Sequence, residues 1–453
     1  MQTADDTRKG WTLYGINIIM KNSGKAEEDI CHTINVQQTG GCFMIIKQYI
    51  KEFEKLGFGM FVHFGLYSVL GKGEWALHSL KLDPNEYFKL RKEFNPVADW
   101  ADQLCVAAKQ AGVKYITLTT RHHDGYSLYD TCGLNDFDSV HDNGRDLVRE
   151  FVDACHAHGI IPFFYHTLLD WTEPRYKEDF PAYLDYLRNS VEILCTKYGK
   201  IGGLWFDGMW DKPDADWEED ALYAMIRKHQ PEAMIINNTG LSALGALGHI
   251  ELDSVTFERG KPAPLNMEGA PKYVASEMCQ VFADHWGYTK DDLNFKSPAS
   301  MIRDLCVCRR YGSNLLMNVG PMGDGTLRLM DRAIYDLMGQ WVGINGEAIY
   351  APYPSGIEVE NKEDDFILVN GNTYYLFCDK LPMSADPNVA LKIQNAERFQ
   401  EVFKLDKKIK KITWLDNGEE AEYEQDGDKV IVKTKPYMYG RQLVVRVAKI
   451  EVE

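Results

Sequence analysis

The chain has 453 residues, 45% of them hydrophobic and 26% charged, which is ordinary for a globular protein of two or three domains. A formal net charge of −17 argues against nucleic acid or an anionic membrane surface as a partner, because both would repel the chain. No apolar run approaches the roughly 18 residues that are needed to cross a bilayer.

The cysteines and the start of the chain bear on its compartment. Ten cysteines are scattered without a CxxC pair, which favours reduced thiols and an intracellular protein. The apolar stretch GINIIM is too short for a signal peptide, and no A-x-A cleavage site follows it. We therefore expect a cytoplasmic protein, or one that is released without a signal peptide.

Residues 1–43 are polar and weakly periodic, and we interpret them as a loosely attached N-terminal extension. A helical pattern, MIIKQYIKEFEKLG, begins at Met44. Eight apolar runs follow between residues 58 and 322: FGMFVHFGLYS, KYITLTTRHH, IIPFFYHTLLDW, GGLWFDGMW, AMIINNT, ELDSVTFERG, CQVFADHWGY and GSNLLMNVGP. Most are apolar throughout, which is typical of strands covered on both faces.

Helical patterns separate most of these runs. In NPVADWADQLCVAAKQAG, Asn95 is the expected N-cap, Pro96 takes the first helical position and Gly112 follows the last turn. Similar patterns occur in DLVREFVDACHAHG, YLDYLRNSVEILCTKYG and DALYAMIRKHQP, whereas GLSALGALGH is only weakly helical. Eight strand-helix units predict a (β/α)8 barrel over residues 44–352, in preference to a doubly wound open sheet.

The pattern changes after about residue 353. The stretches FILVNGNTYYLFCD, KKITWLDNGEEAEYEQ and DKVIVKTK read as strands, and they are interrupted at Asn370-Gly371, Asn417-Gly418 and Asp426-Gly427. Such pairs are typical of tight turns between strands. We therefore predict that residues 353–453 form an all-β sandwich.

The chemistry of a (β/α)8 barrel lies at the carboxyl ends of its strands. Polar and aromatic residues follow almost every run here, and they would converge on one face: His63, Tyr67, Glu74, Trp75, His122, His123, Asp124, Tyr165, His166, Trp171, Trp205, Asp207, Trp210, Asn237, Asn238, Glu258, Arg259, His285, Trp286 and Asn318. Any one alone would be interpreted as packing or as a hydrogen-bonded core residue. Together, imidazoles, carboxylates and indoles are typical of a carbohydrate pocket.

The segment Arg121-His122-His123-Asp124-Gly125 also has the residue types of a metal site. Adjacent residues at a strand end point in different directions, however, and no HExxH motif accompanies them. We therefore expect no metal, and we interpret Asp124 as an anchor for the turn.

Two carboxylates are the candidates for catalysis. Asp207 lies among apolar neighbours in LWFDGMW, where an unpaired carboxylate would be costly, so it needs partners or a function. Glu258 ends the sixth run, and it could instead have a structural role in an ion pair with Arg259. Glu277, expected on a loop before the seventh strand, is the reserve. A pair of carboxylates facing a sugar suggests glycoside hydrolysis.

Seven segments, in this order, resemble the α-L-fucosidases of glycoside hydrolase family 29: FGMFVHFGLYSVLGKGEW, RHHDGYSLYDT, FFYHTLLDW, LWFDGMW, DHWGY, NLLMNVGPMGDG and GEAIY. They extend from about residue 53 to residue 353, and the β-rich tail is similar to the family's C-terminal sandwich. Residues 1–43 have no counterpart in this resemblance.

The resemblance implies a retaining, exo-acting hydrolase that removes terminal α-L-fucose through a covalent fucosyl-enzyme, without a metal or an organic cofactor. Asp207 would be the nucleophile and Glu258 the acid/base, with Glu277 in reserve. The fucose ring would be held by His63, Glu74, Trp75, His122, His123, Tyr165, Trp205 and Trp286. The family often has an arginine after the fifth strand, where this chain reads NNTG, and Arg259 is the candidate replacement. The implied partner is a fucosylated oligosaccharide or glycoconjugate.

Two other functions fit the same barrel face. One is a non-catalytic carbohydrate-binding barrel, which the paired carboxylates disfavour. The other is a glycosidase that acts on another sugar. Linkage preference and oligomeric state do not follow from the sequence.

Overall fold

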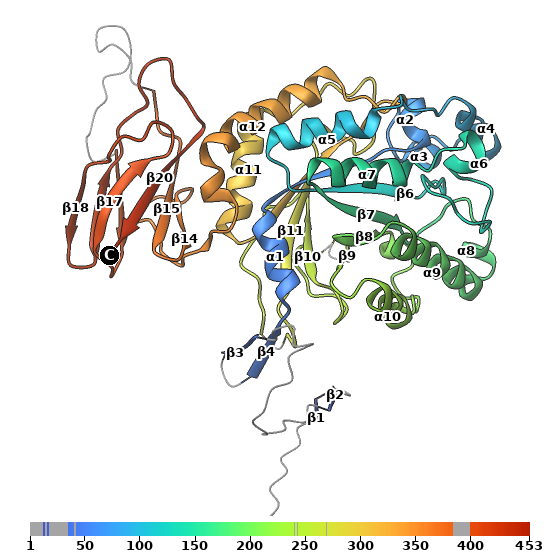
Figure 1. Cartoon of the computed structure of the whole chain (residues 1–453), viewed down its shortest axis with the longest axis horizontal. Helices are drawn as coiled ribbons and strands as arrows, with labels where there is room; N and C mark the ends of the chain where they lie inside the picture. Colours follow the sequence, from blue (N-terminus) through green and yellow to red (C-terminus); the bar gives the residue numbers. More distant parts are fainter. Residues whose placement is uncertain are drawn as a thin grey trace, which may run out of the picture.

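The structure is a computed structural model that describes residues 12–13, 16–17, 35–39, 42–239, 241, 243–268, 270–383 and 399–453. Most of the predicted N-terminal extension therefore lies outside the described residues. Within it, β1 (Thr12–Leu13) pairs with β2 (Ile16–Asn17), and β3 (Asn35–Thr39) pairs with β4 (Cys42–Ile46) (Figure 1). The helical pattern predicted from Met44 is helical only in α1 (Gln48–Leu56).

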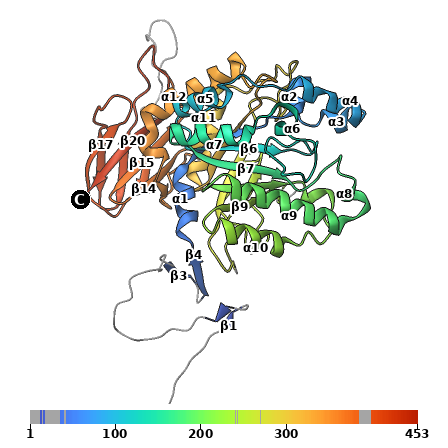
Figure 2. The same ribbon diagram turned by 45° about the vertical axis from the view of Figure 1, so that its right-hand side comes forward.

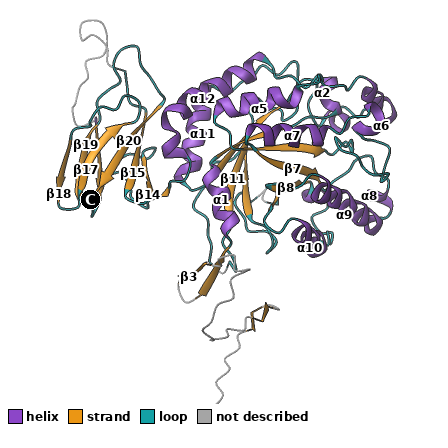
Figure 3. Ribbon diagram, viewed as in Figure 1, coloured by secondary structure: helices purple, strands orange, loops and turns teal. Residues whose placement is uncertain are grey.

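Eight parallel strands close into a barrel, which confirms the predicted (β/α)8 architecture. They are β5 (Phe58–Val62), β6 (Tyr115–Arg121), β7 (Ile161–Thr167), β8 (Gly203–Asp207), β9 (Met234–Asn237), β10 (Ser254–Glu258), β11 (Ala275–Gln280) and β12 (Asn314–Val319). β12 pairs with β5 and closes the ring. Figure 3 shows the strands with helices outside them.

The outer layer consists mainly of long helices after the strands: α5 (Trp100–Ala111), α7 (Leu147–His158), α9 (Phe180–Lys197), α10 (Glu219–His229), α11 (Pro298–Arg310) and α12 (Leu329–Ile349). Shorter helical turns lie in the loops: α2 (Leu66–Leu70), α3 (Ala76–Ser79), α4 (Pro84–Tyr87), η1 (Phe88–Lys92), α6 (Ser139–Asn143), α8 (Arg175–Glu178) and η2 (Met209–Asp211). The described residues between β9 and β10, and between β10 and β11, contain no helix.

The prediction that Asn95 caps the first long helix, with Pro96 at its first position, is wrong. α5 begins at Trp100 after Asp99, whereas Gly112 ends it in the left-handed conformation as predicted. The preceding turn is held by other contacts. Asn95 accepts a hydrogen bond from the Arg145 guanidinium, and the backbone N–H of Val97 donates to Asp324.

The seventh strand lies earlier than predicted. It is β11, and it places Glu277 inside the strand instead of on a preceding loop. The motif DHWGY follows in the loop. The polar pattern of this strand hides its burial, because Glu277 is 1% exposed and has hydrogen-bond partners inside the barrel.

Large side chains fill the barrel interior, among them Phe61, Tyr115, Phe163 and Trp205. Gly59 on β5 makes room for Tyr115, since a Cβ at this glycine would lie 2.3 Å from the tyrosine ring. The absence of a side chain at Gly59 therefore lets the tyrosine extend across the barrel.

The C-terminal region is the predicted all-β sandwich. One sheet has the order β13 (Tyr353–Pro354), β14 (Phe366–Asn370), β15 (Thr373–Asp379), β20 (Val445–Val452) and β17 (Ile409–Trp414). The other has β16 (Gln400–Lys404), β19 (Lys429–Lys433) and β18 (Tyr423–Asp426). The predicted turn glycines Gly371, Gly418 and Gly427 all have positive φ.

The sandwich packs on α11 and α12, and the views of Figures 1 and 2 agree on this arrangement. Side chains of its first sheet share one hydrophobic cluster with the barrel helices. The Trp341 indole on α12 donates to the Val445 carbonyl at 3.0 Å, and Arg303 on α11 pairs with Asp379 at 2.8 Å. In the described part of the chain, no helix is long and apolar enough to cross a membrane.

Candidate active site

A small cavity of about 80 Å³ opens at the carboxyl ends of the barrel strands. Its lining consists of Phe61, His63, Trp75, His122, Tyr165, Trp205, Asp207, Trp210, Asn238, Leu241, Glu258, Cys279 and Trp286. A larger hollow of about 960 Å³ lies beside α1, at the opposite ends of the strands. We assign the chemistry to the smaller cavity, because it brings two carboxylates and several imidazoles together where barrel enzymes place their sites.

Asp207 ends β8 and receives hydrogen bonds on both carboxylate oxygens. Its Oδ2 accepts from the Tyr165 hydroxyl at 3.2 Å and lies 3.5 Å from His123 Nε2. Its Oδ1 accepts from the Trp210 indole at 3.1 Å and from Asn238 Nδ2 at 3.4 Å. Burial alone would raise the pKa of Asp207, but hydrogen bonds from His123, Trp210 and Asn238 outweigh it and lower this pKa. The group is therefore an ionised carboxylate at neutral pH.

Glu258 ends β10 and lies close to Asp207 through a shared partner. Asn238 Nδ2 donates to Glu258 Oε2 at 2.6 Å and to Asp207 Oδ1 at 3.4 Å. Because both oxygens contact one nitrogen, they are at most about 6 Å apart. Burial and the negative charge of Asp207 raise the pKa of Glu258, the opposite direction to that of Asp207. Two neighbouring carboxyl groups with diverging pKa values form a typical acid/base arrangement.

Asn238 itself is held by the hydroxyl of Thr256, which donates to Asn238 Oδ1 at 3.0 Å. It follows β9 directly, so three consecutive strands supply the Asp207, Asn238 and Glu258 side chains. The neighbouring Asn237 instead donates to the Tyr223 hydroxyl. Successive residues at the strand end thus face different sides, and only Asn238 lines the cavity.

Two buried imidazoles of the cavity wall are neutral. Burial lowers the pKa of His63 to about 3, and it holds the pKa of His122 well below its usual range. His63 Nδ1 lies 2.7 Å from Asn318 Oδ1, whereas His122 Nδ1 has no partner among the described residues. A neutral imidazole has one donor and one acceptor nitrogen, which suits a sugar hydroxyl.

His123 faces the nucleophile candidate from behind the cavity wall. It is 1% exposed, and its Nδ1 lies 2.6 Å from the Thr167 hydroxyl. The contact with Thr167 orients the ring so that Nε2 faces Asp207. The two adjacent histidines therefore have different partners, as expected for neighbouring positions at a strand end.

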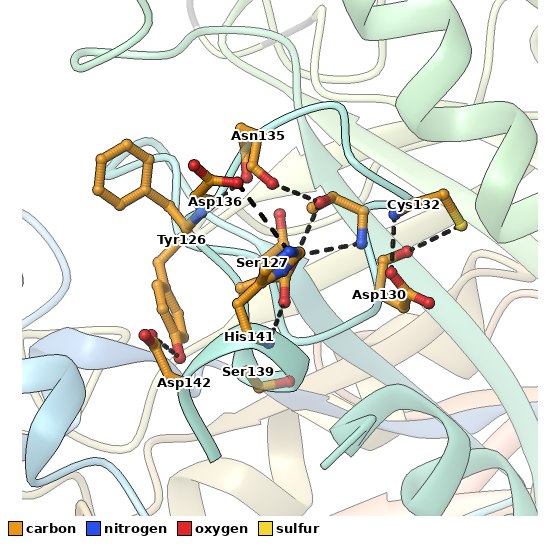
Figure 4. Close-up of polar contacts among 12 residues, drawn as sticks. Tyr126, Ser127, Asp130, Cys132, Asn135, Asp136, Ser139, His141 and Asp142 are labelled. Atoms are coloured by element: carbon orange, nitrogen blue, oxygen red, sulfur yellow. Dashed lines mark hydrogen bonds and ion pairs between the residues drawn. The ribbon is translucent and has the colours of Figure 1, made fainter. Parts of the chain in front are cut away.

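Asp124 is buried in the turn that follows these histidines. It accepts hydrogen bonds from the Tyr87 hydroxyl at 2.6 Å and from the backbone N–H of Tyr126, and burial raises its pKa to about 6. A polar network continues along the loop to residue 142 (Figure 4). At its centre, Asp138 accepts from Thr131 and from His141. These contacts fix the segment that carries His122 and His123.

Glu277 lies below the cavity and is absent from its lining. It accepts hydrogen bonds from the Tyr115 hydroxyl and from the Trp205 indole, the latter at 3.0 Å. Burial raises the pKa of Glu277 to about 7. Glu258 pairs in register with Cys279, so Glu277 points inward one layer deeper in the barrel. Its visible role is to hold the Trp205 ring.

Aromatic side chains form the remaining walls. Trp75 stacks on Trp210 with ring centroids 5.7 Å apart, and Trp286 lies 5.2 Å from His63. Glu74 is buried behind the wall and accepts from the backbone N–H of Gly287 at 2.7 Å. It therefore braces the loop that carries Trp286.

The structure thus brings most of the predicted site residues together. His63, Trp75, His122, Tyr165, Trp205 and Trp286 line the cavity with Asp207 and Glu258, whereas His123, Glu74 and Glu277 stand behind it. Trp210 and Asn238 were recognised only as strand-end residues, and their contacts with Asp207 were not predicted. Phe61, Leu241 and Cys279 were missed because apolar residues carry no chemical signal in a sequence.

One further cluster has metal-ligand spacing among the described residues, and it lies in the sandwich: Asp365, Cys378 and Glu401. Lys362 pairs with Glu401 there at 3.1 Å. A cation thus already neutralises part of its charge.

Comparisons with known proteins point to one family. The family model described as alpha-L-fucosidase matches residues 45–347. Tissue alpha-L-fucosidase from Bos taurus is 29% identical over 344 residues, which cover 68% of this chain and 70% of that protein. Among solved structures, alpha-L-fucosidase isoenzyme 1 from Paenibacillus thiaminolyticus is 28% identical with a TM-score of 0.74, covering 90% of this chain and 99% of that chain. A GH29 alpha-L-fucosidase from Bacteroides thetaiotaomicron has a TM-score of 0.75 at 23% identity, covering 94% and 98%, and supports the same fold.

Proposed function

Since the chain belongs to the α-L-fucosidase family, glycoside hydrolase family 29, we propose that its barrel removes terminal α-L-fucose from fucosylated oligosaccharides or glycoconjugates. Asp207 is the nucleophile in this proposal, and Glu258 is the acid/base. The product is free α-L-fucose, because the reaction retains the configuration at the anomeric carbon.

The distance between the two carboxyl groups carries the proposal. Their nearest identified oxygens are at most about 6 Å apart, because both contact Asn238 Nδ2. Retaining glycosidases have carboxyl groups roughly 5–5.5 Å apart, whereas inverting enzymes need about 6.5–9.5 Å to admit a water molecule between them. The spacing therefore supports direct attack by Asp207.

The reaction proceeds in two displacements. Asp207 attacks C1 of the fucosyl group while Glu258 donates its proton to the departing glycosidic oxygen, which leaves as an alcohol. A fucosyl ester of Asp207 and ionised Glu258 result. Glu258 then takes a proton from water as the water oxygen attacks C1, which releases fucose and restores both groups. Neither step calls for a metal or an organic cofactor.

The environment supports these roles. The lowered pKa of Asp207 keeps the nucleophile ionised, and the raised pKa of Glu258 favours the protonated donor. Neutral His63 and His122 supply donor and acceptor nitrogens for ring hydroxyls. The small cavity suits a single sugar ring, which favours action on the terminal residue of a chain.

Removal of the nucleophile tests the function. Asp207→Ala should abolish hydrolysis of 4-nitrophenyl α-L-fucoside, and near-normal turnover would overturn the mechanism. The same assay with an aryl β-galactoside addresses a glycosidase of another sugar. Failure of the wild-type protein to turn over either substrate would favour a non-catalytic sugar-binding barrel.

The acid/base is identified by leaving-group dependence. Glu258→Ala should slow methyl α-L-fucoside, a poor leaving group, far more than the nitrophenyl substrate, because only the poor leaving group needs a proton. Glu277→Ala is the matched comparison on the neighbouring strand. If its losses, and not those of Glu258→Ala, depend on the leaving group, then Glu277 is the acid/base.

We also infer that the protein works in a reducing compartment, the cytoplasm. The eight cysteines from Cys105 to Cys378 are free, and the Cys105 and Cys155 sulfurs lie 3.8 Å apart in the core without a disulfide between them. Close unbridged thiols are typical of proteins from reducing compartments. Fractionation of the producing cells tests this inference, and recovery in the medium as a signal-processed form would contradict it.

A further inference from the structure

An apolar surface lies beside Glu258, on the loop between β9 and β10. Leu241 lines the cavity together with Glu258. Leu244 packs against Gly260, because a Cβ added to this glycine would lie 2.2 Å from Leu244 Cδ1. Leu241 and Leu244 are each 44% exposed, so both offer apolar surface to solvent, Leu241 at the cavity and Leu244 beside Gly260, two residues after Glu258.

Contacts with β10 hold this loop in position. The backbone N–H of Gly245 donates to the Thr256 carbonyl at 3.0 Å. Gly245 has φ +74, and a Cβ there would lie 2.5 Å from the Phe257 ring. A side chain is thus excluded at Gly245 by both space and conformation. Leu244, which directly precedes Gly245, is consequently placed relative to Glu258, which follows Phe257.

The chemistry of the loop is unlike that of a sugar-binding surface. From Thr239 to Gly248 the sequence has no charged or amide side chain, although 26% of the chain is charged. Arg259, which directly follows Glu258, is engaged elsewhere: its guanidinium lies 5.2 Å from the centre of the Trp286 ring and donates to the Asp284 carbonyl at 2.7 Å. A second sugar would bring several hydroxyl groups to a rim that supplies few partners for them.

We propose that Leu241 and Leu244 form the leaving-group subsite, and that this subsite prefers an alkyl or aryl aglycone to a second sugar. The inference rests on the proposed function, since it takes Glu258 as the group that protonates the departing oxygen. An apolar chain leaving from C1 passes along the two leucines, and its burial removes apolar surface from water. An alkoxide leaves poorly, so proton donation by Glu258 remains necessary for such substrates.

The test compares substrates that differ in the length of the alkyl chain and not in leaving-group chemistry. Octyl and methyl α-L-fucoside both release a simple alcohol, so their ratio of kcat/KM reports contact along the alkyl chain. The wild-type ratio should be about tenfold or more in favour of the octyl compound. Octyl α-L-fucoside should also exceed fucosyl-α1,2-galactose in kcat/KM.

Three variants on the same loop localise the effect. Leu241→Ser and Leu244→Ser should each reduce the octyl-to-methyl ratio by about threefold to tenfold. Leu247→Ser is the matched control. Leu247 is 43% exposed on the same loop, but it is neither part of the cavity lining, as Leu241 is, nor the side chain nearest to Gly260, as Leu244 is. Its ratio should equal that of the wild type.

Two results would overturn the subsite. One is a wild-type octyl-to-methyl ratio near unity, and the other is an equal loss in Leu247→Ser and Leu241→Ser. Hydrolysis of α-L-fucosyl fluoride by the wild-type protein separates this outcome from failure of the proposed function, since fluoride is too small to need the subsite. If the fluoride is hydrolysed, such a result refutes only the subsite. If no fucoside or fluoride is cleaved, the proposed function fails and the subsite with it.

Discussion

Replacement of Asn238 by alanine should shift the whole pH dependence of kcat/KM toward alkaline pH. In the structure one amide nitrogen donates to Glu258 at 2.6 Å and to Asp207 at 3.4 Å. Both hydrogen bonds stabilise a carboxylate, and both lower the pKa of the group that accepts them. Asn238→Ala removes both bonds with a single side chain.

The sign of the shift is the same on both limbs of the profile. Activity needs ionised Asp207, whose pKa sets the acid limb, and protonated Glu258, whose pKa sets the basic limb. Both pKa values rise when the amide is lost. A hydrogen bond to a charged group contributes about 1.5–3 kcal/mol, and one pKa unit corresponds to about 1.4 kcal/mol. Each limb should therefore move by roughly one to two pH units, and kcat/KM measured on the wild-type acid limb should fall by roughly 10- to 100-fold.

The assay is kcat/KM for 4-nitrophenyl α-L-fucoside between pH 3 and pH 9, with thermal unfolding measured in parallel. Asn237→Ala is the control, because Asn237 contacts Tyr223 and not the carboxyl groups. It should lower the unfolding temperature without moving either limb. An acid shift in Asn238→Ala, or an equal alkaline shift in the control, would refute this account of the two pKa values.

Three further predictions follow from single contacts. Tyr165→Phe removes a hydroxyl that donates to Asp207 at 3.2 Å, so the pKa that sets the acid limb of the kcat/KM profile should rise. On that limb kcat/KM should fall by about three- to tenfold, and movement of the basic limb would contradict this. Glu401 has a pKa raised to about 7 by burial, so the folded protein should lose up to about 3 kcal/mol of stability as pH rises from about 4 to 7. Glu401→Gln should remove that loss in unfolding experiments at pH 5 and pH 8, and an unchanged pH dependence would refute the assignment. Gly59→Ala should lower stability to urea by about 1–3 kcal/mol by displacing the Tyr115 ring, and an unchanged midpoint would show that the ring moves freely.

The barrel and the sandwich were predictable because their signals are local. Solid apolar runs and turn glycines, such as Gly371, depend on burial and backbone conformation of short segments. The wrong predictions concern element boundaries that depend on contacts between residues far apart in the sequence. Asn95 has the residue type of an N-cap, but its side-chain oxygen accepts a hydrogen bond from Arg145, and the helix begins only at Trp100. The seventh strand was misplaced because Glu277 gives it a polar pattern that only its partners across the barrel explain.

The sequence predicts which residues lie at the carboxyl ends of the barrel strands, but not which way each side chain points. Strand-end residues of a closed barrel must converge, so the sequence indicates that Asp207 and Glu258 approach one another. Which side chain joins them depends on the register of three strands, and Asn238 was therefore recognised only as a neighbour. Glu277 illustrates the same limit, because its place two residues before Cys279 puts it below the cavity instead of at the mouth.

The shared core of the two domains bears on how the molecule folds and how it can be cut. Phe366, Phe377 and Val447 of the sandwich belong to the same hydrophobic cluster as the barrel helices, and the Trp341 indole is bonded to the Val445 carbonyl. Denaturation should therefore be a single cooperative transition, with loss of activity coincident with loss of the sandwich. Truncation after residue 352 would expose an apolar surface on α11 and α12. The shortened barrel should therefore aggregate during expression, although it keeps every residue around Asp207.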